Sequence, residues 1–470
     1  MPEIPSPATL DVESGPPLPR GFGLSMGTYV VVSSMIGVGV LTTSGFTVAS
    51  VGSNQLMLLL WLVGAVLALC GALCVAELAA ALPASGGDYV YLYEAYGPLA
   101  AFLTGWVSFL IGFAAPIAAS AFASASYLLA PLALPPASAR LANQTLATLA
   151  ILAFAVIHSS HAVRAGRAHT AVTILKLCIL VAFAAIGLVA GWGRWENLAD
   201  RPPITWDTAS AMIFSLVYIS YGYTGWNAAS YLAGEIDEPG RTLPRAILIG
   251  TGLVVALYLG LNTVYALALP ASEIQQIVKD RGFDAVAPIA QLAATRLLGP
   301  AVTAPLSIAF GLTLLASLSA YVLTGPRVAL AMARAGHFPA VAGRISPRTQ
   351  APVFATVAQV AWALFLLWSG SFENILIYAS VGLAIFSMLA VSSVLVLRRT
   401  RPDLHRPFRT PGFPVVPLIF LVGTGLLTAA AFAQRPMASL YSLLTILAGV
   451  PVYYALFRRE GRRGPSGPAD

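Results

Sequence analysis

The chain has 470 residues, of which 58% are hydrophobic and only 10% carry a charge, with a formal net charge of +7. A soluble protein carries about 25% charged residues, because water must solvate its surface. The composition therefore excludes an ordinary soluble enzyme or soluble binding domain.

Apolar stretches of roughly 20 residues recur along the whole chain, and each is long enough to cross the ~30 Å hydrocarbon layer of a bilayer. We predict an all-α membrane protein with twelve transmembrane helices, the third of which is long enough to tilt. The expected spans are 22–48, 55–81, 96–130, 140–160, 166–190, 208–233, 244–268, 300–333, 351–368, 372–396, 413–432 and 437–458. Residues 1–20 and 459–470 are expected to be cytoplasmic tails, the first of them disordered.

The basic residues support this count and give an orientation. If the N-terminus is cytoplasmic, eighteen Lys and Arg residues fall in cytoplasmic segments, seven fall on the opposite side, and Lys176 falls inside a span. This bias is the one expected of an inserted helical bundle. We therefore expect a multi-pass protein of the cell inner membrane with both termini in the cytoplasm, and no nucleic acid as a partner.

Two spans contain glycines near mid-membrane: Gly37 and Gly39 in the first, and Gly222 and Gly225 in the sixth. Glycine is about 1 kcal/mol worse than alanine in a helix, and backbone released from a helix must line a cavity enclosed by protein. Interrupted helices at matching places in two halves point to a transporter's binding site, although such glycines also serve close helix packing. Each interrupted span opens a block of five spans, and two helices follow; the three units are 21–195, 205–398 and 410–458.

The interruptions predict a chemistry. A half-helix that begins at Val38 and Gly39 presents free N–H groups, which suit a carboxylate. Half-helices that end near Met35 and Tyr221 present free carbonyl groups, which suit an ammonium group. This combination predicts a site for an α-amino acid, with neither a cofactor nor a metal.

Lys176 lies deep inside the fifth span. A charged lysine at mid-membrane costs about 2.5–3.5 kcal/mol on insertion scales, so we expect it to face the interior and to serve a function. We interpret it as a proton-coupling residue; the alternative is a permanently charged lysine that ties helices together. Glu77 and Glu373, at the ends of the second and tenth spans, are expected to form caps or salt bridges.

The chain resembles the amino acid–polyamine–organocation (APC) superfamily of permeases over nearly its full length, including the large-neutral-amino-acid transporter branch. The residues that carry this resemblance are 36–40, 77–89, 96–98, 105–106, 222–227, 235, 239–244, 327, 331–336, 401–403 and 406–409. The resemblance implies a leucine-transporter-type fold of two inverted five-helix repeats plus two C-terminal helices, with helices 1 and 6 broken. It also implies alternating access around a central site.

In such permeases the N–H groups after the first-helix glycine hold the substrate carboxylate, which corresponds to Val38 and Gly39. The sixth-helix aromatic residue that caps the site corresponds to Tyr221, and the carbonyl groups beyond it lie around Thr224. A sixth-helix asparagine near the substrate corresponds to Asn227. The candidate substrate-binding residues are therefore Met35, Gly37, Val38, Gly39, Tyr221, Thr224, Gly225 and Asn227.

Lys176 matches a fifth-helix lysine that replaces a sodium ion in sodium-independent relatives, and Thr313 and Ser317 are its expected neighbours. These three are the candidate proton-coupling residues. Two positions depart from the family pattern: Val38 stands where many relatives have Ser, and Tyr221 stands where Phe or Trp is usual.

The sequence thus predicts a sodium-independent secondary transporter of neutral or hydrophobic amino acids, either a proton-coupled symporter or an exchanger. The alternatives are an amino acid/polyamine antiporter for cationic substrates and an amino acid sensor that transports nothing. A membrane enzyme would need clustered catalytic groups, which the cytoplasmic segments lack. The expected partners are an amino acid, the lipid bilayer and, as a candidate coupling ion, the proton.

Overall fold

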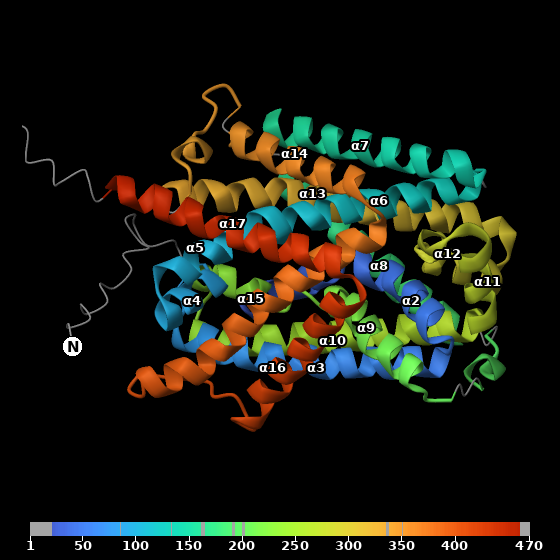
Figure 1. Ribbon diagram of the computed structural model, residues 1–470, viewed down its shortest axis with the longest axis horizontal. Helices are drawn as coiled ribbons and strands as arrows, with labels where there is room; N and C mark the ends of the chain where they lie inside the picture. The colour runs from blue at the N-terminus through green and yellow to red at the C-terminus, as the bar shows by residue number, and fades with distance from the viewer. Residues whose placement is uncertain are drawn as a thin grey trace, which may run out of the picture.

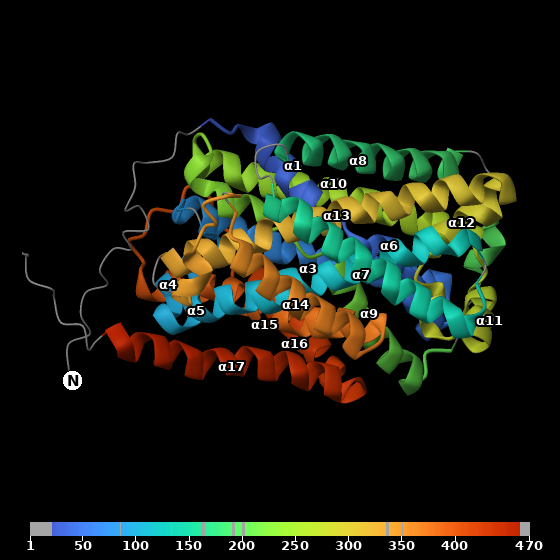
Figure 2. The same cartoon turned by 90° about the horizontal axis from the view of Figure 1, so that it is seen from above.

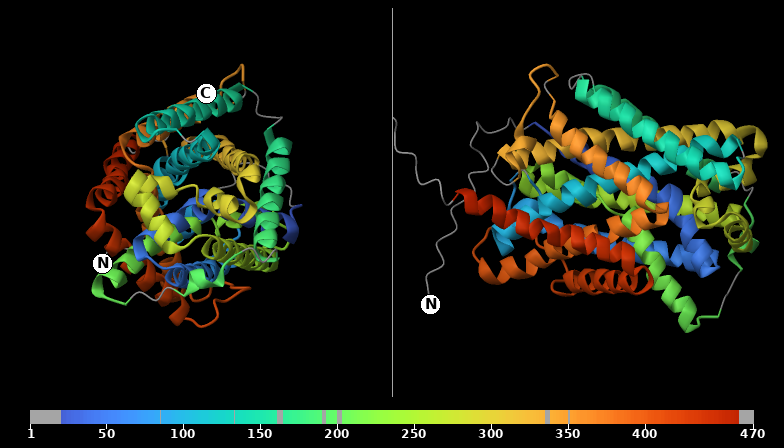
Figure 3. Two further views of the ribbon diagram at one scale, coloured as in Figure 1. Left: turned by 90° about the vertical axis from the view of Figure 1, so that its right-hand side faces the viewer. Right: turned by 45° about the horizontal axis from the view of Figure 1, so that its top comes forward.

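The computed structural model describes residues 21–84, 86–132, 134–160, 165–189, 193–199, 203–334, 338–349 and 351–460. Within these ranges the chain is helical, and its only β-type pairing is an isolated parallel bridge between Phe22 and Ile236. Most helices run along the long axis of a single bundle (Figures 1, 2 and 3). The end of the bundle that holds α4 (Asp88–Tyr96) is called the α4 end below, and the opposite end, which holds α11 (Ala271–Arg281), is called the α11 end (Figure 1).

The remaining α-helices follow in chain order. Those in the first half are α1 (Leu24–Met35), α2 (Val38–Val51), α3 (Asn54–Ala81), α5 (Pro98–Val107), α6 (Ala114–Leu129), α7 (Pro136–Ser160) and α8 (Ala165–Val189). Those in the second half are α9 (Trp206–Gly222), α10 (Pro239–Ala268), α12 (Ile289–Leu298), α13 (Pro300–Arg334), α14 (Val353–Ser369), α15 (Phe372–Thr400), α16 (Val415–Gln434) and α17 (Pro436–Glu460). A π-helical segment, η1 (Ser108–Phe113), joins α5 to α6, and the 3₁₀ segments are η2 (Ala130–Leu132), η3 (Trp195–Leu198), η4 (Ala228–Glu235), η5 (Phe283–Val286) and η6 (Ala340–Gly343).

Eight helices of the described residues are long and apolar enough to cross a membrane, or nine if the bent pair α1 and α2 counts as one span. Of the other expected spans, 166–190 coincides with α8, in which Thr173–Val189 is the apolar part, and 208–233 and 351–368 overlap α9 and α14 with 17 residues each. The all-α class is confirmed, whereas the count of twelve spans stays a prediction. Of the expected tails, residues 1–20 and 461–470 lie outside the described ranges, and α17 continues to Glu460.

The outer surface of the bundle carries many large apolar side chains. Leu62 on α3, Phe365 on α14 and Val422 on α16 are all exposed. Extended apolar patches are rare on soluble monomers, so this surface suits contact with lipid.

Two glycines let the interrupted first and sixth spans touch backbone to backbone. A Cβ on Gly39 would lie 2.3 Å from Cα of Gly222, and a Cβ on Gly225, whose φ is +103°, would lie 2.9 Å from the carbonyl carbon of Ser34. Only glycine permits both contacts, because any side chain would collide with main chain. The end of α1, the start of α2 and the end of α9 are therefore adjacent.

A backbone pairing joins the same two spans again at the α4 end. The N–H groups of Gly21 and Phe22 both donate to the carbonyl oxygen of Glu235 at 3.1 Å, and the N–H group of Asp237 donates to the carbonyl oxygen of Phe22 at 3.0 Å. The segment that leads into α1 is thus fixed to the segment that follows η4.

Candidate functional site

The first span changes direction between α1 and α2. α1 ends at Met35, Ile36 is extended with φ −78° and ψ 101°, and α2 begins at Val38 after a bend of 41°. The first N–H groups of any helix lack partners within the helix, and no side chain caps the start of α2. The N–H groups at Val38 and Gly39 therefore form a positively polarised end that suits a carboxylate.

The sixth span leaves the α-helical conformation after Gly222. Residues 223–227 form turns, and η4 follows them. Thr224 donates from its N–H group and its hydroxyl to the carbonyl oxygen of Tyr221, at 3.2 and 2.8 Å. The carbonyl oxygen of Tyr221 is therefore hydrogen-bonded to Thr224, whereas the sequence predicts that it has no partner.

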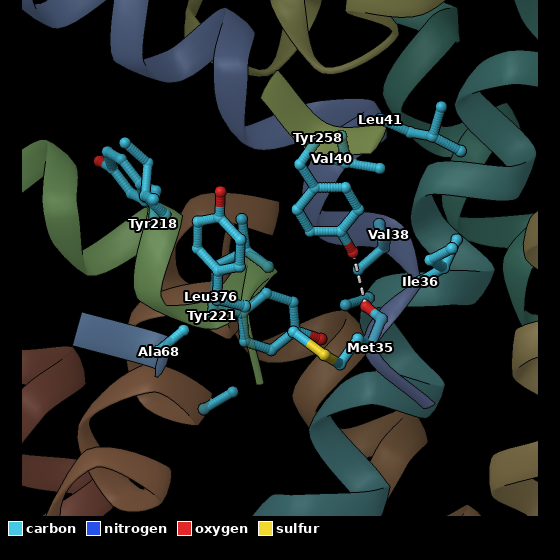
Figure 4. Packing of buried hydrophobic residues seen from close by; sticks show 14 of the residues in the cluster. Met35, Ile36, Val38, Val40, Leu41, Ala68, Tyr218, Tyr221, Tyr258 and Leu376 are labelled. Atoms are coloured by element: carbon cyan, nitrogen blue, oxygen red, sulfur yellow. Dashed lines mark hydrogen bonds between the residues drawn. The ribbon is translucent and has the colours of Figure 1, made fainter. Parts of the chain in front are cut away.

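The carbonyl groups at the end of α1 also have partners. The hydroxyl of Tyr258, on α10, donates to the carbonyl oxygen of Met35 at 2.6 Å (Figure 4), and Nζ of Lys176 donates to the carbonyl oxygen of Ile36 at 2.5 Å. A carbonyl oxygen has two lone pairs, so each can still accept one bond from a ligand's ammonium group.

Tyr258 is a site residue that sequence reasoning missed. Its signal was a tyrosine in the middle of the seventh span, because a buried Tyr hydroxyl needs a hydrogen-bond partner. Tyr321, on α13, was missed as well: a Cβ on Gly37 would lie 3.7 Å from its hydroxyl oxygen.

Lys176, on α8, is buried and joins three elements. Besides the Ile36 contact, its Nζ donates to Oγ of Ser317 on α13 at 3.3 Å. The ion pairs formed within the described ranges involve other residues, so no described Asp or Glu lies within 4 Å of this ammonium group. The hydroxyl of Thr313 instead donates to the carbonyl oxygen of Phe310 in its own helix, at 2.7 Å.

Asn227 is directed toward the α4 end. Its Nδ2 donates to Oδ2 of Asp88, the first residue of α4, at 2.6 Å. The side chain predicted to lie near substrate therefore contacts a carboxylate group in the structure.

The α11 end is closed by aromatic rings. Phe46 on α2 stacks on Phe283 of η5 with ring centroids 4.9 Å apart, and Phe122 on α6 stacks on Phe372 of α15 at the same distance. Phe46 also contacts Phe372 and Tyr218 of α9, at 5.9 and 5.7 Å. These rings, which are buried apart from the half-buried Phe283, separate the interrupted segments from the α11 end.

The expected salt bridges of Glu77 and Glu373 are confirmed. Glu77 accepts two hydrogen bonds from Arg398, at 2.9 and 2.7 Å. Glu373 accepts from Arg435 at 3.0 Å and from the hydroxyl of Tyr218 at 2.5 Å. In the part of the chain that the structure describes, no group of three His, Cys, Asp or Glu side chains could hold a metal ion.

The chain is similar to known proteins over most of its length. A family model described as amino acid permease matches residues 22–457. The chain is 28% identical over 445 residues to Asc-type amino acid transporter 1 of Mus musculus, an alignment that covers 93% of this chain and 81% of that protein. It is also 28% identical to the cystine/glutamate transporter of Homo sapiens, over 93% of this chain and 85% of the relative. The same identity relates it to the large neutral amino acids transporter small subunit 2 of Rattus norvegicus, over 94% and 81%.

Proposed function

Because the chain belongs to the amino acid permease family, as its resemblance to the APC superfamily predicted, we propose that it carries neutral or hydrophobic amino acids across the cell inner membrane without sodium. It acts as a proton-coupled symporter or as an exchanger. The family and the relatives indicate a transporter of amino acids and not an enzyme.

The contact between the two interrupted spans carries this proposal. The N–H groups of Val38 and Gly39 receive the carboxylate of the substrate, and the carbonyl oxygen of Met35, which keeps one lone pair free beside the Tyr258 hydroxyl, receives its ammonium group. Segments 34–39 and 221–227 contain no charged residue. Backbone groups thus recognise the part that all amino acids share, and nothing there would pair with a charged substrate side chain.

Lys176 supports sodium independence. Its ammonium group donates to a main-chain carbonyl oxygen and to a hydroxyl oxygen, Ile36 and Ser317, which are the kinds of ligand that unwound backbone offers to a sodium ion in transporters. A cation that belongs to the protein occupies this place, so a second cation would be repelled. A change in its protonation couples transport to the proton.

The proposal includes an architecture and an orientation. Twelve spans form two inverted repeats of five helices plus α16 and α17, and α1/α2 and α9/η4 are the two broken helices. The α4 end faces the cytoplasm, because the arginine-rich residues 398–409 lie there. Tyr221 closes over the bound substrate, and the two broken helices rock between the inward-facing and outward-facing states.

Uptake by the purified protein in liposomes tests the proposal, with a panel of labelled amino acids, with and without sodium, and with an imposed pH gradient. We expect uptake of neutral amino acids that does not depend on sodium and that rises with a pH gradient or with internal counter-substrate. Uptake that requires sodium would contradict the proposal. Exchange of only cationic amino acids or polyamines would favour the antiporter, and binding without uptake would favour a sensor.

A further inference from the structure

Asp88 connects α4 to the sixth span at the α4 end. It follows Gly86 and Gly87, whose φ angles of +129° and +52° turn the chain sharply into α4. Its Oδ2 accepts a hydrogen bond from Nδ2 of Asn227 at 2.6 Å and a longer one from the hydroxyl of Tyr231 at 3.4 Å. One carboxylate group therefore holds the turn after Gly222 and η4 together against the start of α4.

The surfaces around this contact fit closely. A Cβ on Gly87 would lie 2.8 Å from Oγ of Ser230 and 3.1 Å from the ring of Tyr231. The hydroxyl of Ser230 donates to the carbonyl oxygen of Asn227 at 2.6 Å, which fixes the residue that bonds Asp88. The loop before α4 could not press against η4 in this way if residue 87 carried a side chain.

Asp88 is only 8% exposed, and its carboxylate group is incompletely paired. Its Oδ1 has no hydrogen-bond partner among the described residues, and none of the ion pairs in those ranges includes it. Burial raises the pKa of Asp88 to about 6, although the hydrogen bonds from Asn227 and Tyr231 lower it. The charged form is thus less stable where the group now lies than it would be in water.

The titratable groups that face Asp88 offer no compensating positive charge. They are the hydroxyls of Tyr91, from α4 itself, and of Tyr231, from η4. On α15, which packs against α4, the nearest arginines are already paired, Arg398 with Glu77 and Arg401 with Glu94.

We propose that Asp88 is a proton-operated latch, that is, a contact that keeps the α4 end closed. With a proton bound, Asp88 holds the interrupted sixth span against α4. After losing the proton, its side chain enters water and frees that span to move. The proposal rests on the proposed function, because it assumes that the α4 end opens during transport. Asp88 acts as a positioning residue for the broken helix and does not contact the substrate.

Linkage gives the sign and the size of the effect. The latched form binds the proton more tightly than the released form, in which the carboxyl group is hydrated and recovers its ordinary pKa of 3.8. The extra stability of the latched form is therefore present in acid and is lost as the pH rises through about 6. Between pH 5 and pH 7.5 the ratio of latched to released molecules falls roughly tenfold.

Hydrogen exchange of the amides of residues 223–235 in purified protein measures this ratio without any transport assay. Asp88→Asn is the reference at each pH, because it keeps the shape but cannot ionise. Relative to this variant, we expect protection in the wild-type protein to fall about tenfold from pH 5 to pH 7.5. Asp207→Asn is the control, since it removes an exposed carboxylate group from the start of α9 that takes part in none of the ion pairs of the described ranges, and it should keep the wild-type pH dependence.

If the protection of wild-type protein relative to Asp88→Asn changes less than twofold between pH 5 and pH 7.5, the latch proposal is wrong. If Asp88→Asn does not assemble, Asn227→Ala replaces it: exchange at pH 5 should rise to the wild-type level at pH 7.5, and unchanged exchange at pH 5 would equally overturn the proposal. If exchange depends on pH as expected but no amino acid is taken up, the latch proposal holds and the proposed transport function is wrong. Uptake together with pH-independent exchange would do the reverse.

Discussion

The two halves of the first span are built differently. α2 buries twelve of its 14 residues, whereas α1 buries only Gly27, Val31 and Met35 of its 12. α2 carries Phe46, one of the stacked rings of the α11 end. α1 is held by the hydroxyl of Tyr258 at one end and by the backbone pairing of Phe22 at the other.

This difference indicates which end of the bundle opens at the lower cost. A typical hydrogen bond contributes about 0.5–1.5 kcal/mol net, whereas truncating a buried aromatic side chain costs about 3–5 kcal/mol. The contacts described around Phe46 are aromatic packing, whereas those between η4 and α4 are mainly hydrogen bonds, so the contact between η4 and α4 is the easier one to release.

The largest effect is expected where α2 crosses α9. In Gly39→Ala the new Cβ would lie 2.3 Å from Cα of Gly222, and main chain cannot move aside as a flexible side chain can. We expect uptake to fall to about 1% of wild type or less, with a lower thermal unfolding midpoint, because overpacking costs about 1–3 kcal/mol even in cores that relax. Gly252→Ala, on α10, is the control, since its Cβ would meet no atom within 4 Å. Equal behaviour of the two variants would show that the two broken spans do not touch.

The second-largest effect is expected at Lys176, which contacts the break between α1 and α2. Lys176→Met removes the ammonium group from the carbonyl oxygen of Ile36 and leaves that oxygen buried without its charged donor. Hydrogen bonds to charged groups contribute about 1.5–3 kcal/mol, so uptake should fall about ten- to hundredfold and lose its dependence on pH. Cys178→Met, at an exposed position of the same helix, should change neither. A Lys176→Met protein with the wild-type rate and pH profile would refute the coupling role.

The smallest effect sharpens the comparison between the halves. Tyr258→Phe removes the hydroxyl that holds Met35, and Tyr218→Phe removes the one that holds Glu373 at the α11 end. Hydrogen exchange should rise about fivefold in α1 for Tyr258→Phe, in line with one lost hydrogen bond. Tyr218→Phe should leave exchange in α2 within twofold of wild type, because the ring still packs beneath Phe46. Similar increases in both helices would mean that the two ends are held equally.

The sequence was sufficient where the signal is local. Composition and charge distribution predicted a helical membrane protein, and the glycines at 37, 39, 222 and 225 lie where α1 gives way to α2 and where α9 ends. The positions of Glu77 and Glu373 at the ends of two spans predicted a cap or a salt bridge for each, whereas their partners Arg398 and Arg435 came from the structure.

The missed contacts depend on how helices rotate against one another, which no local pattern encodes. Asn227 and Asp88 are 139 residues apart, and only the packing of η4 on the loop before α4 brings them together. The hydroxyl of Tyr258 meets Met35 across 223 residues in the same way. A resemblance to permeases assigns roles by position, whereas the direction of each side chain has to be seen.

The backbone pairing of residues 21 and 22 with residues 235–237 ties the start of the first span to the segment that follows the sixth span at the α4 end. A change at Gly21 or Phe22 therefore acts on Glu235 as directly as on Leu24. A label attached at residue 21 or 22 would thus report on both segments at once, whereas a label on α11 lies at the opposite end of the bundle (Figure 1).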